Sequence, residues 1–230
     1  MFALVTVLLA SYLIGSIPSS IWVGKIYKGI DIRDHGSGNA GATNTFRILG
    51  WKAGVVVLLI DLLKGFLCTA VISQLAYLIG SGPVAPAIWE TDSFLKITCG
   101  TFAVVGHMFP LYASFEGGKG AATAAGMLYG IEPLSISISV VIFITVILAS
   151  RYVSLGSMIA SIIYPISQII LIRYFNWPID ISVVIFSSAL ALGIVAKHHG
   201  NIKRLLNGTE NRISSFKPSK GRINEDQSPA

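Results

Sequence analysis

The sequence predicts an all-α fold, a polytopic transmembrane bundle of about seven helices. Hydrophobic residues make up 53% of the 230 residues and charged residues only 12%, whereas a soluble domain carries about 25% charged residues. Several apolar runs of about 20 residues, enough to cross a bilayer as a helix, follow one another along the chain. No hydrophilic stretch is long enough for a separate soluble domain, so residues 1–213 are expected to form one domain.

Seven apolar segments are expected to form helices: residues 2–24, 53–79, 94–112, 119–131, 133–150, 154–174 and 179–197. The first lacks the basic residues that open a signal peptide, and Lys25 and Lys28 follow its apolar run, which favours an uncleaved helix. Most of the others have the length of a crossing. The fourth would reach only about 20 Å against a hydrocarbon core of about 30 Å, so a half-helix or a re-entrant segment is an alternative.

The distribution of basic residues predicts the orientation of the helices. With seven crossings and the N-terminus outside, 14 of the 17 lysines and arginines fall in the cytoplasm, as the positive-inside rule requires. A re-entrant fourth segment would send the basic C-terminal region outside, so seven crossings are favoured. The C-terminus is then cytoplasmic, and the polar residues 214–230 are expected to form a disordered tail.

The net charge of +6 comes from basic residues that are split among loops without interleaved aromatic residues. That pattern excludes nucleic acid as a partner, whereas membrane lipid and anionic substrates remain candidates. Three polar segments interrupt the apolar chain, and the predicted orientation places all three at the cytoplasmic face.

The first polar segment, SGNAGATN at residues 37–44, is rich in glycine. Glycines let successive backbone N–H groups converge on an anion, and an arginine one turn further on offers a bidentate fork to phosphate. A flexible inter-helix loop is the simpler interpretation, but the polar cluster favours a binding role. The candidate residues are Ser37, Gly38, Asn39, Gly41, Thr43, Asn44 and Arg47.

The second polar segment contains the string EGGKG at residues 116–120. A Walker A loop would need glycine at position 113 and serine or threonine at position 120, so Ala113 and Gly120 exclude a P-loop NTPase. Glycines before a helix start still favour an anion. His107, upstream, is more typical of a hydrogen bond at a helix end than of a catalyst. The candidate residues here are Gly117, Gly118, Lys119, Gly120 and Thr123.

The third polar segment, residues 198–210, follows the last apolar helix. His198 and Asn201 are spaced i, i+3, so a short helix could present both on one face. A solvated basic helix beside the membrane is the alternative interpretation. The candidate residues are His198, Asn201, Arg204 and Glu210, together with Ser157 near the start of the sixth helix.

Asp61 and Lys64 form a charged pair within the second apolar segment. Their i, i+3 spacing allows them to pair, and intramembrane charges are candidate functional residues, so Lys64 is included among the candidate substrate-binding residues. Lys64 could equally extend toward the interface. No G-x-S-x-G or H-E-x-x-H string occurs, so the site is expected to bind two phosphates without a covalent enzyme intermediate, a metal or a cofactor.

Taken together, the three segments resemble the bacterial acyl-phosphate-dependent glycerol-3-phosphate acyltransferase family, called PlsY. The matching strings are SGNAGATN with Arg47, GHMFPLYASFEGGKGAAT and HHGNIKRLLNGTE, in the family's order and at similar spacing. The resemblance covers residues 1–213. It implies a seven-helix enzyme of the bacterial inner membrane with a cytoplasmic active site. The implied reaction moves a fatty acyl group from acyl phosphate to the 1-hydroxyl of glycerol 3-phosphate, giving lysophosphatidic acid and phosphate.

The resemblance also implies residue roles. Ser37, Thr43 and Asn44 are assigned to the acyl-phosphate side, and Glu210 is expected to brace a nearby cation. The glycerol 3-phosphate side receives Arg47, Lys119, His198, Asn201 and Ser157. The substrate's own phosphate is expected to accept the hydroxyl proton, with His198 as the alternative base.

Two other classes of function remain open from the residues alone. Anion-binding loops would also suit a transporter or channel for a phosphorylated solute, although a transporter usually places its site near the bilayer midplane. A purely structural membrane subunit is the other class, and the density of phosphate-binding groups argues against it.

Overall fold

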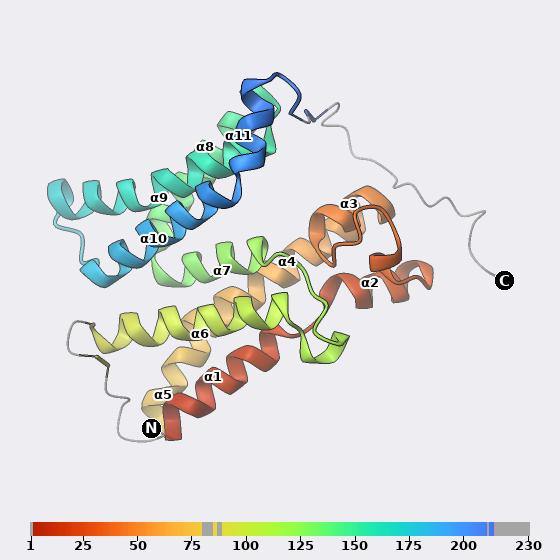
Figure 1. Cartoon of the computed structure of the whole chain (residues 1–230). Coiled ribbons are helices and arrows are strands. Elements are labelled where there is room, and N and C mark those ends of the chain that lie inside the picture. Colours follow the sequence, from red (N-terminus) through yellow and green to blue (C-terminus); the bar gives the residue numbers. More distant parts are fainter. Residues whose placement is uncertain (1, 80–84, 87–88, 211, 214–230) are drawn as a thin grey trace. The chain divides into compact units, whose positions relative to one another are not determined.

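The computed structural model describes residues 2–79, 85–86, 89–210 and 212–213, and every regular element among them is a helix (Figure 1). The predicted all-α class is therefore confirmed. The contacts divide these residues into two compact units: unit 1 holds 2–79, 85–86 and 94–131, and unit 2 holds 89–93, 132–210 and 212–213. The single domain expected over residues 1–213 stays a prediction, and the predicted tail at 214–230 lies outside the described residues.

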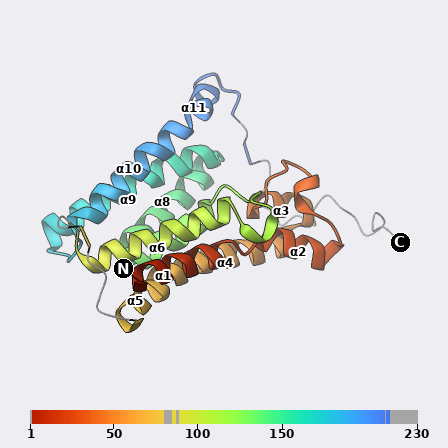
Figure 2. The same ribbon diagram turned by 60° about the horizontal axis from the view of Figure 1, so that its bottom comes forward.

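Unit 1 is built on the first three apolar segments and the short fourth one. Its elements are α1 (Phe2–Gly15), α2 (Ser19–Lys28), η1 (Ile32–Asp34), α3 (Ala42–Leu49), α4 (Trp51–Leu67), η2 (Cys68–Ile72), α5 (Ser73–Ile79), α6 (Thr91–Met108) from residue 94 onward, η3 (Leu111–Ala113) and α7 (Ala121–Ile131). In both views α1, α4 and α6 run side by side (Figures 1 and 2).

The first predicted helix, 2–24, is wrong in one respect, because the chain forms two helices there. Pro18 has no N–H to donate and disfavours helical geometry in the residue before it, so α1 ends at Gly15 and α2 begins at Ser19. α2 then continues to Lys28, where Gly29 ends it with a φ of +67°. The second predicted helix is continuous from Trp51 to Ile79, with a π-helical turn at η2.

Glycines let the helices of unit 1 approach to backbone contact. A Cβ added to Gly65 of α4 would overlap the carbonyl oxygen of Thr123, and one added to Gly126 of α7 would overlap that of Leu62. Small residues at such contacts are the usual basis of helix packing within membranes, where the hydrophobic effect supplies no attraction between helices. α4 and α7 are therefore locked together by shape.

Unit 2 consists of α8 (Pro133–Ser150), α9 (Val153–Phe175), α10 (Ile181–Lys197) and the short α11 (His199–Leu206). α9 packs against both α8 and α10. Glu132 caps α8 by accepting hydrogen bonds from the N–H groups of Leu134 and Ser135. The three apolar helices predicted at 133–150, 154–174 and 179–197 are confirmed to within two residues.

Among the residues that the structure describes, five helical segments are long and apolar enough to cross a membrane: Phe2–Lys28, Trp51–Ile79, Thr91–Ala113, Pro133–Ser150 and Val153–Phe175. A sixth candidate is Ile181–Ala196 taken together with His199–Leu206, which are bent by 53°. α7 has 11 residues and is shorter than a crossing, as the sequence predicts for the fourth segment. The orientation of the termini stays a prediction.

Candidate functional site

The first polar segment is half loop and half helix. Ser37 and Gly38 are exposed in the loop, whereas Thr43 and Arg47 are exposed on α3, one turn apart. The alternative interpretation of this segment as an inter-helix loop holds only for its first half, because the chain becomes helical from Ala42. Arg47 and Thr43 consequently share one face of α3, and the backbone leading to them carries the glycines.

Asn44 holds this loop in shape. Its side chain is 1% exposed, and its amide nitrogen donates to the carbonyl oxygens of Ile32 at 3.0 Å and His35 at 2.9 Å, while its oxygen accepts from the N–H of Ser37 at 3.0 Å. Both N–H donors of the amide are therefore occupied by the protein. Gly36 has a φ of +66°, and a Cβ there would overlap the Asn44 oxygen. Asn44 thus orders the loop that presents Ser37.

The second polar segment meets the first at Gly118. A Cβ added to Gly118 would lie 2.6 Å from the carbonyl oxygen of Ala40 and would overlap the imidazole of His107. Its N–H donates to the carbonyl oxygen of His107 at 3.2 Å. Only glycine fits between these groups, so the two glycine-rich segments, far apart in the sequence, form one surface of unit 1.

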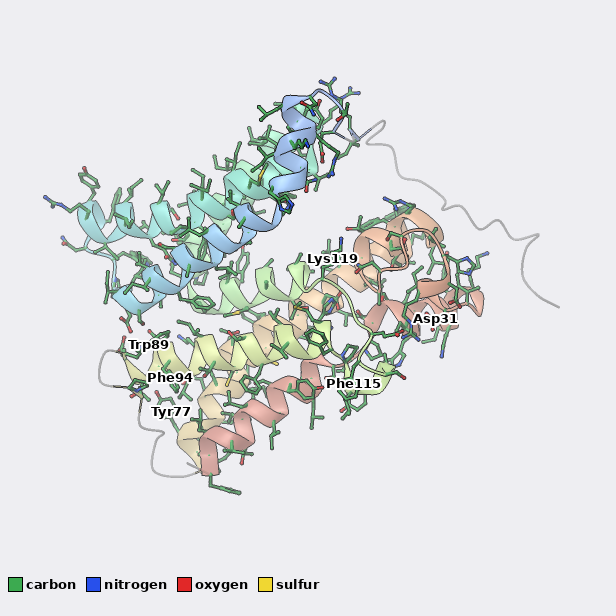
Figure 3. All side chains as sticks on the ribbon, viewed as in Figure 1. Asp31, Tyr77, Trp89, Phe94, Phe115 and Lys119 are labelled. Carbon is green, nitrogen blue, oxygen red and sulfur yellow. The ribbon has the colours of Figure 1, made fainter. Side chains whose placement is uncertain are left out.

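Lys119 is exposed on this surface, immediately before α7. The helix begins at Ala121, two residues later than predicted, and Gly120 has a φ of +78° that a residue with a side chain rarely adopts. Lys119 lies with Asp31 and Phe115 at one end of unit 1, and Tyr77 and Phe94 lie at the other (Figure 3). Thr123 is fully buried, so of the expected residues after Gly118 only Lys119 faces outward with its side chain.

Arg33 ties the two segments together and was not among the expected residues. Two nitrogens of its guanidinium group donate hydrogen bonds to the Asp31 carboxylate, at 2.8 and 3.1 Å. The same group donates to the carbonyl oxygen of Ala113 at 3.2 Å and to the carboxylate of Glu116 at 3.3 Å. The Arg33 hydrogen bond lowers the pKa of Asp31 below its usual range. The Asp-x-Arg spacing of residues 31 and 33 could have indicated their ion pair. The contacts of Arg33 with Ala113 and Glu116 could not be predicted from the sequence, because they join positions about 80 residues apart.

Lys64 lies inside unit 1 and is 3% exposed. Its ammonium group contacts the Asp61 carboxylate at 3.0 Å and donates to the carbonyl oxygen of Ile17 at 3.0 Å. The pairing that the i, i+3 spacing allows is therefore formed, and Lys64 does not extend toward an interface. Lys64 is therefore occupied by protein groups at the break between α1 and α2, and its contact with substrate stays a prediction.

In unit 2 the third polar segment is organised by Glu210. Its carboxylate accepts from Ser154 Oγ, Asn201 Nδ2 and Arg204 Nε, each at 2.8 Å. These hydrogen bonds, that of Asn201 first, lower the pKa of Glu210. The expected bracing of a cation by Glu210 is thus present, with Arg204 as the cation. The carboxylate also connects the start of α9 to α11.

His198 caps the end of α10, with its Nδ1 atom 2.8 Å from the carbonyl oxygen of Ile194. A carbonyl oxygen only accepts, so this contact requires a proton on Nδ1, and in the tautomer with that single proton Nε2 is an acceptor. That tautomer suits a group that receives a hydrogen bond from a substrate hydroxyl. Ser157 donates to the carbonyl oxygen of Val153 at 3.0 Å, one turn from Ser154.

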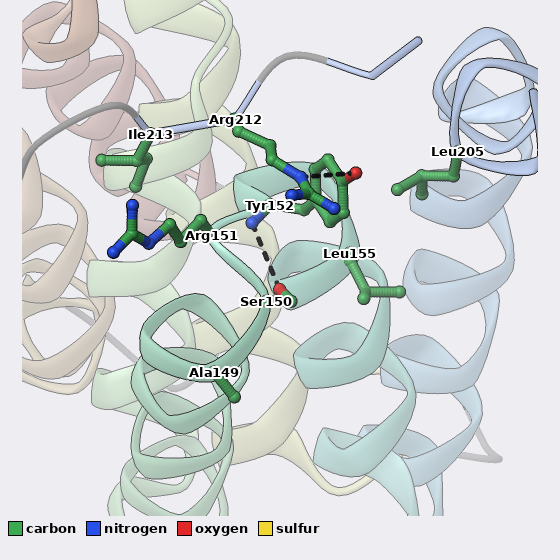
Figure 4. Close-up of a pocket in the computed structure, with 8 residues that line it drawn as sticks. All are labelled: Ala149, Ser150, Arg151, Tyr152, Leu155, Leu205, Arg212 and Ile213. Carbon is green, nitrogen blue, oxygen red and sulfur yellow. Dashed lines mark hydrogen bonds between the residues drawn. The ribbon is translucent and has the colours of Figure 1, made fainter. Parts of the chain in front are cut away.

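A cavity of about 640 Å³ opens beside the turn between α8 and α9 in unit 2 (Figure 4). Arg212 donates to the hydroxyl of Tyr152 at 2.8 Å and stacks over its ring at 4.9 Å. The cavity contains none of the expected site residues. Its lining comprises Ala149, Ser150, Arg151, Tyr152, Leu155, Leu205, Arg212 and Ile213.

Comparisons with known proteins point to one family. The family model described as "Glycerol-3-phosphate acyltransferase" matches residues 5–208. Proteins named glycerol-3-phosphate acyltransferase are 45% identical in Salinibacter ruber, over 97% of this chain and 98% of that protein, and 45% identical in Chlorobium limicola, over 95% and 100%.

Two crystal structures of PlsY (YgiH), an integral membrane glycerol 3-phosphate acyltransferase, are also similar. The glycerol 3-phosphate form has a TM-score of 0.68 at 33% identity and covers 92% of this chain and 96% of that one. The lysophosphatidic acid form has a TM-score of 0.70 at 32% identity, covering 92% and 95%. The extent of these matches, together with the helical fold, shows that this chain belongs to the glycerol-3-phosphate acyltransferase family of integral membrane proteins.

Proposed function

We propose that this protein transfers a fatty acyl group from an acyl phosphate to the 1-hydroxyl of glycerol 3-phosphate, releasing lysophosphatidic acid and phosphate. The observation that carries the proposal is the joining of two glycine-rich segments at Gly118, which brings the segment with exposed Ser37 and the segment with the exposed Lys119 cation onto one surface of unit 1. Related proteins are crystallised in forms named for glycerol 3-phosphate and for lysophosphatidic acid, which supports this choice of acceptor and product.

The chemistry follows from the charges of the two substrates. An acyl phosphate already carries a good leaving group, so the enzyme has no need to form an ester of its own. Bringing two anions together is the main obstacle, and exposed Lys119 and Arg47 supply two cations that can offset their charge. The acyl chain can remain in the bilayer or between helices.

The proposed roles keep the expected assignment for most residues. Ser37 and Thr43 serve the acyl phosphate, with Asn44 acting on it through the shape of the loop. Arg47, Lys119, His198, Asn201 and Ser157 serve glycerol 3-phosphate. The hydroxyl proton passes to the phosphate of the substrate, with His198 as the alternative acceptor, and the reaction takes place at the cytoplasmic face of the bacterial inner membrane without a cofactor.

The test uses the purified full-length protein in lipid with palmitoyl phosphate and glycerol 3-phosphate. Equal amounts of lysophosphatidic acid and phosphate, both dependent on glycerol 3-phosphate, are the expected result. Palmitoyl-coenzyme A replaces palmitoyl phosphate in a parallel reaction, and acyl transfer from it alone would contradict the proposed donor. If folded protein forms neither product, uptake of glycerol 3-phosphate into liposomes tests the transporter alternative.

A further inference from the structure

A buried polar cluster lies beneath the joined loops of unit 1. It consists of Ser19 of α2, Asp61 and Lys64 of α4 and His107 of α6, which we call the Asp61 cluster. One carboxylate oxygen of Asp61 accepts from Ser19 Oγ at 2.6 Å and contacts the ammonium of Lys64 at 3.0 Å and Nδ1 of His107 at 3.4 Å. Asp61, Lys64 and His107 are 1%, 3% and 7% exposed.

The charges of the cluster explain why it holds its shape. A charge buried within a membrane protein is very costly unless it is paired, and here the Asp61 carboxylate and the Lys64 ammonium cancel. Because the carboxylate only accepts, it selects an imidazole with a proton on Nδ1. The contact between Nδ1 and the Asp61 carboxylate therefore holds the His107 ring in one orientation.

The other side of His107 faces the loop that carries Lys119. A Cβ on Gly118 would overlap Nε2 of the imidazole, and the carbonyl oxygen of His107 accepts the N–H of Gly118 at 3.2 Å. A Cβ on Gly117 would likewise overlap the carbonyl oxygen of His107. His107 thus contacts the residue before Lys119 with both its ring and its backbone.

We propose that His107 is a positioning residue, oriented by Asp61, that fixes the backbone of Gly117–Gly120 and thereby the placement of Lys119. His107 itself is buried while Lys119 is exposed, so its effect on a bound anion passes through the loop. The inference rests on the proposed function in one respect, namely that the loop binds a substrate phosphate. The Asp61 cluster would then couple the packing of α2, α4 and α6 to the geometry of the site.

The first test requires no substrate and so does not depend on the proposed function. Hydrogen exchange is measured on the peptide covering residues 106–123 in wild type and in the His107→Ala and His107→Asn variants of the full chain. The alanine variant is expected to exchange at least about 10-fold faster at the amides of 117–120. Asparagine keeps an N–H donor near the position of Nδ1, so it should restore part of the protection.

His199 of α11 provides the matched control because its side chain is exposed in unit 2. His199→Ala should leave exchange of the 106–123 peptide unchanged. Wild-type exchange at 117–120 in His107→Ala would overturn the proposal. If His107→Ala does not fold, as judged by gel filtration, the asparagine variant decides: it must exchange faster than wild type at these amides, and unchanged exchange refutes the positioning role.

The second test is a double-mutant cycle on acyl transfer to glycerol 3-phosphate. His107→Ala is expected to lower kcat/KM on the order of 100-fold in the wild-type background, since misplacing a binding group by about 1 Å has that effect. In the Lys119→Ala background the same change should cost less than about 3-fold. Fully multiplicative losses would refute the positioning role. Absence of acyl transfer in wild type would refute the proposed function and leave the exchange test standing.

Discussion

Gly118→Ala tests whether the joined loops form the site. The added Cβ would lie 2.6 Å from the carbonyl oxygen of Ala40, about 0.8 Å short of the 3.4 Å at which ordinary contact begins, and it would overlap the His107 ring as well. Neither neighbour is the free end of a flexible chain, because one is backbone and the other is held by Asp61. The two segments must therefore separate by roughly 1 Å.

A displacement of about 1 Å is expected to lower kcat/KM on the order of 100-fold, or about 2.7 kcal/mol of transition-state stabilisation. Overpacking should also reduce the free energy of unfolding by about 1–3 kcal/mol. The assay is steady-state acyl transfer to glycerol 3-phosphate, with thermal unfolding measured on the same preparations.

Gly193→Ala is the matched control, because a Cβ at that position in α10 meets nothing within 4 Å. It should keep wild-type activity and unfold at a temperature no lower than wild type, since alanine favours a helix over glycine by about 0.5–1 kcal/mol. A folded Gly118→Ala protein whose kcat/KM stays within twofold of wild type would refute the idea that contact at Gly118 shapes the site.

Three further results are expected. Lys119→Ala should lower kcat/KM roughly 10–150-fold, because one charge-assisted hydrogen bond is worth about 1.5–3 kcal/mol. Lys25 is exposed on α2, and Lys25→Ala should keep kcat/KM within twofold of wild type. Equal effects of the two substitutions would contradict the role assigned to Lys119. Gly126→Ala should force α4 and α7 apart, which lowers the free energy of unfolding by about 1–3 kcal/mol and with it the melting temperature. An unchanged melting temperature would show that the helices accommodate the added methyl group. Because the folded-state pKa of Glu210 is lowered, its stabilisation is complete above the ordinary value of 4.5 and is lost as the pH falls through the folded-state pKa. The melting temperature of wild type should therefore exceed that of Glu210→Gln at pH 7, and the difference should shrink as the pH falls below 4.5. A difference that does not shrink at all in acid would contradict this account.

Much of the fold could be predicted because hydropathy is a local property of the chain. The apolar helices from 133 to 197 lie within two residues of their predicted bounds, and the short fourth helix is short in the structure. The break at Pro18 was also signalled locally, since proline removes a donor and restricts its predecessor, but the hydropathy of residues 2–24 concealed it.

Some of the predicted site residues have exposed side chains in the structure, and others have buried ones. Ser37, Arg47 and Lys119 are exposed, whereas Asn44 and Lys64 are buried with protein partners. A sequence pattern shows that a polar side chain is present and not which way it faces. The same limit explains why Arg33 was missed, since its role depends on Ala113 and Glu116.

Composition and spacing are properties of the chain read in order, so they suffice to predict a helical membrane protein with three polar segments suited to phosphate. Tertiary structure alone decided that Gly118 meets Ala40, that Arg33 spans 83 positions to reach Glu116, and that Asp61 holds His107. The physical reason is that burial and pairing depend on neighbours brought together by packing. A polar residue becomes a brace or a binding group only once those neighbours are in place.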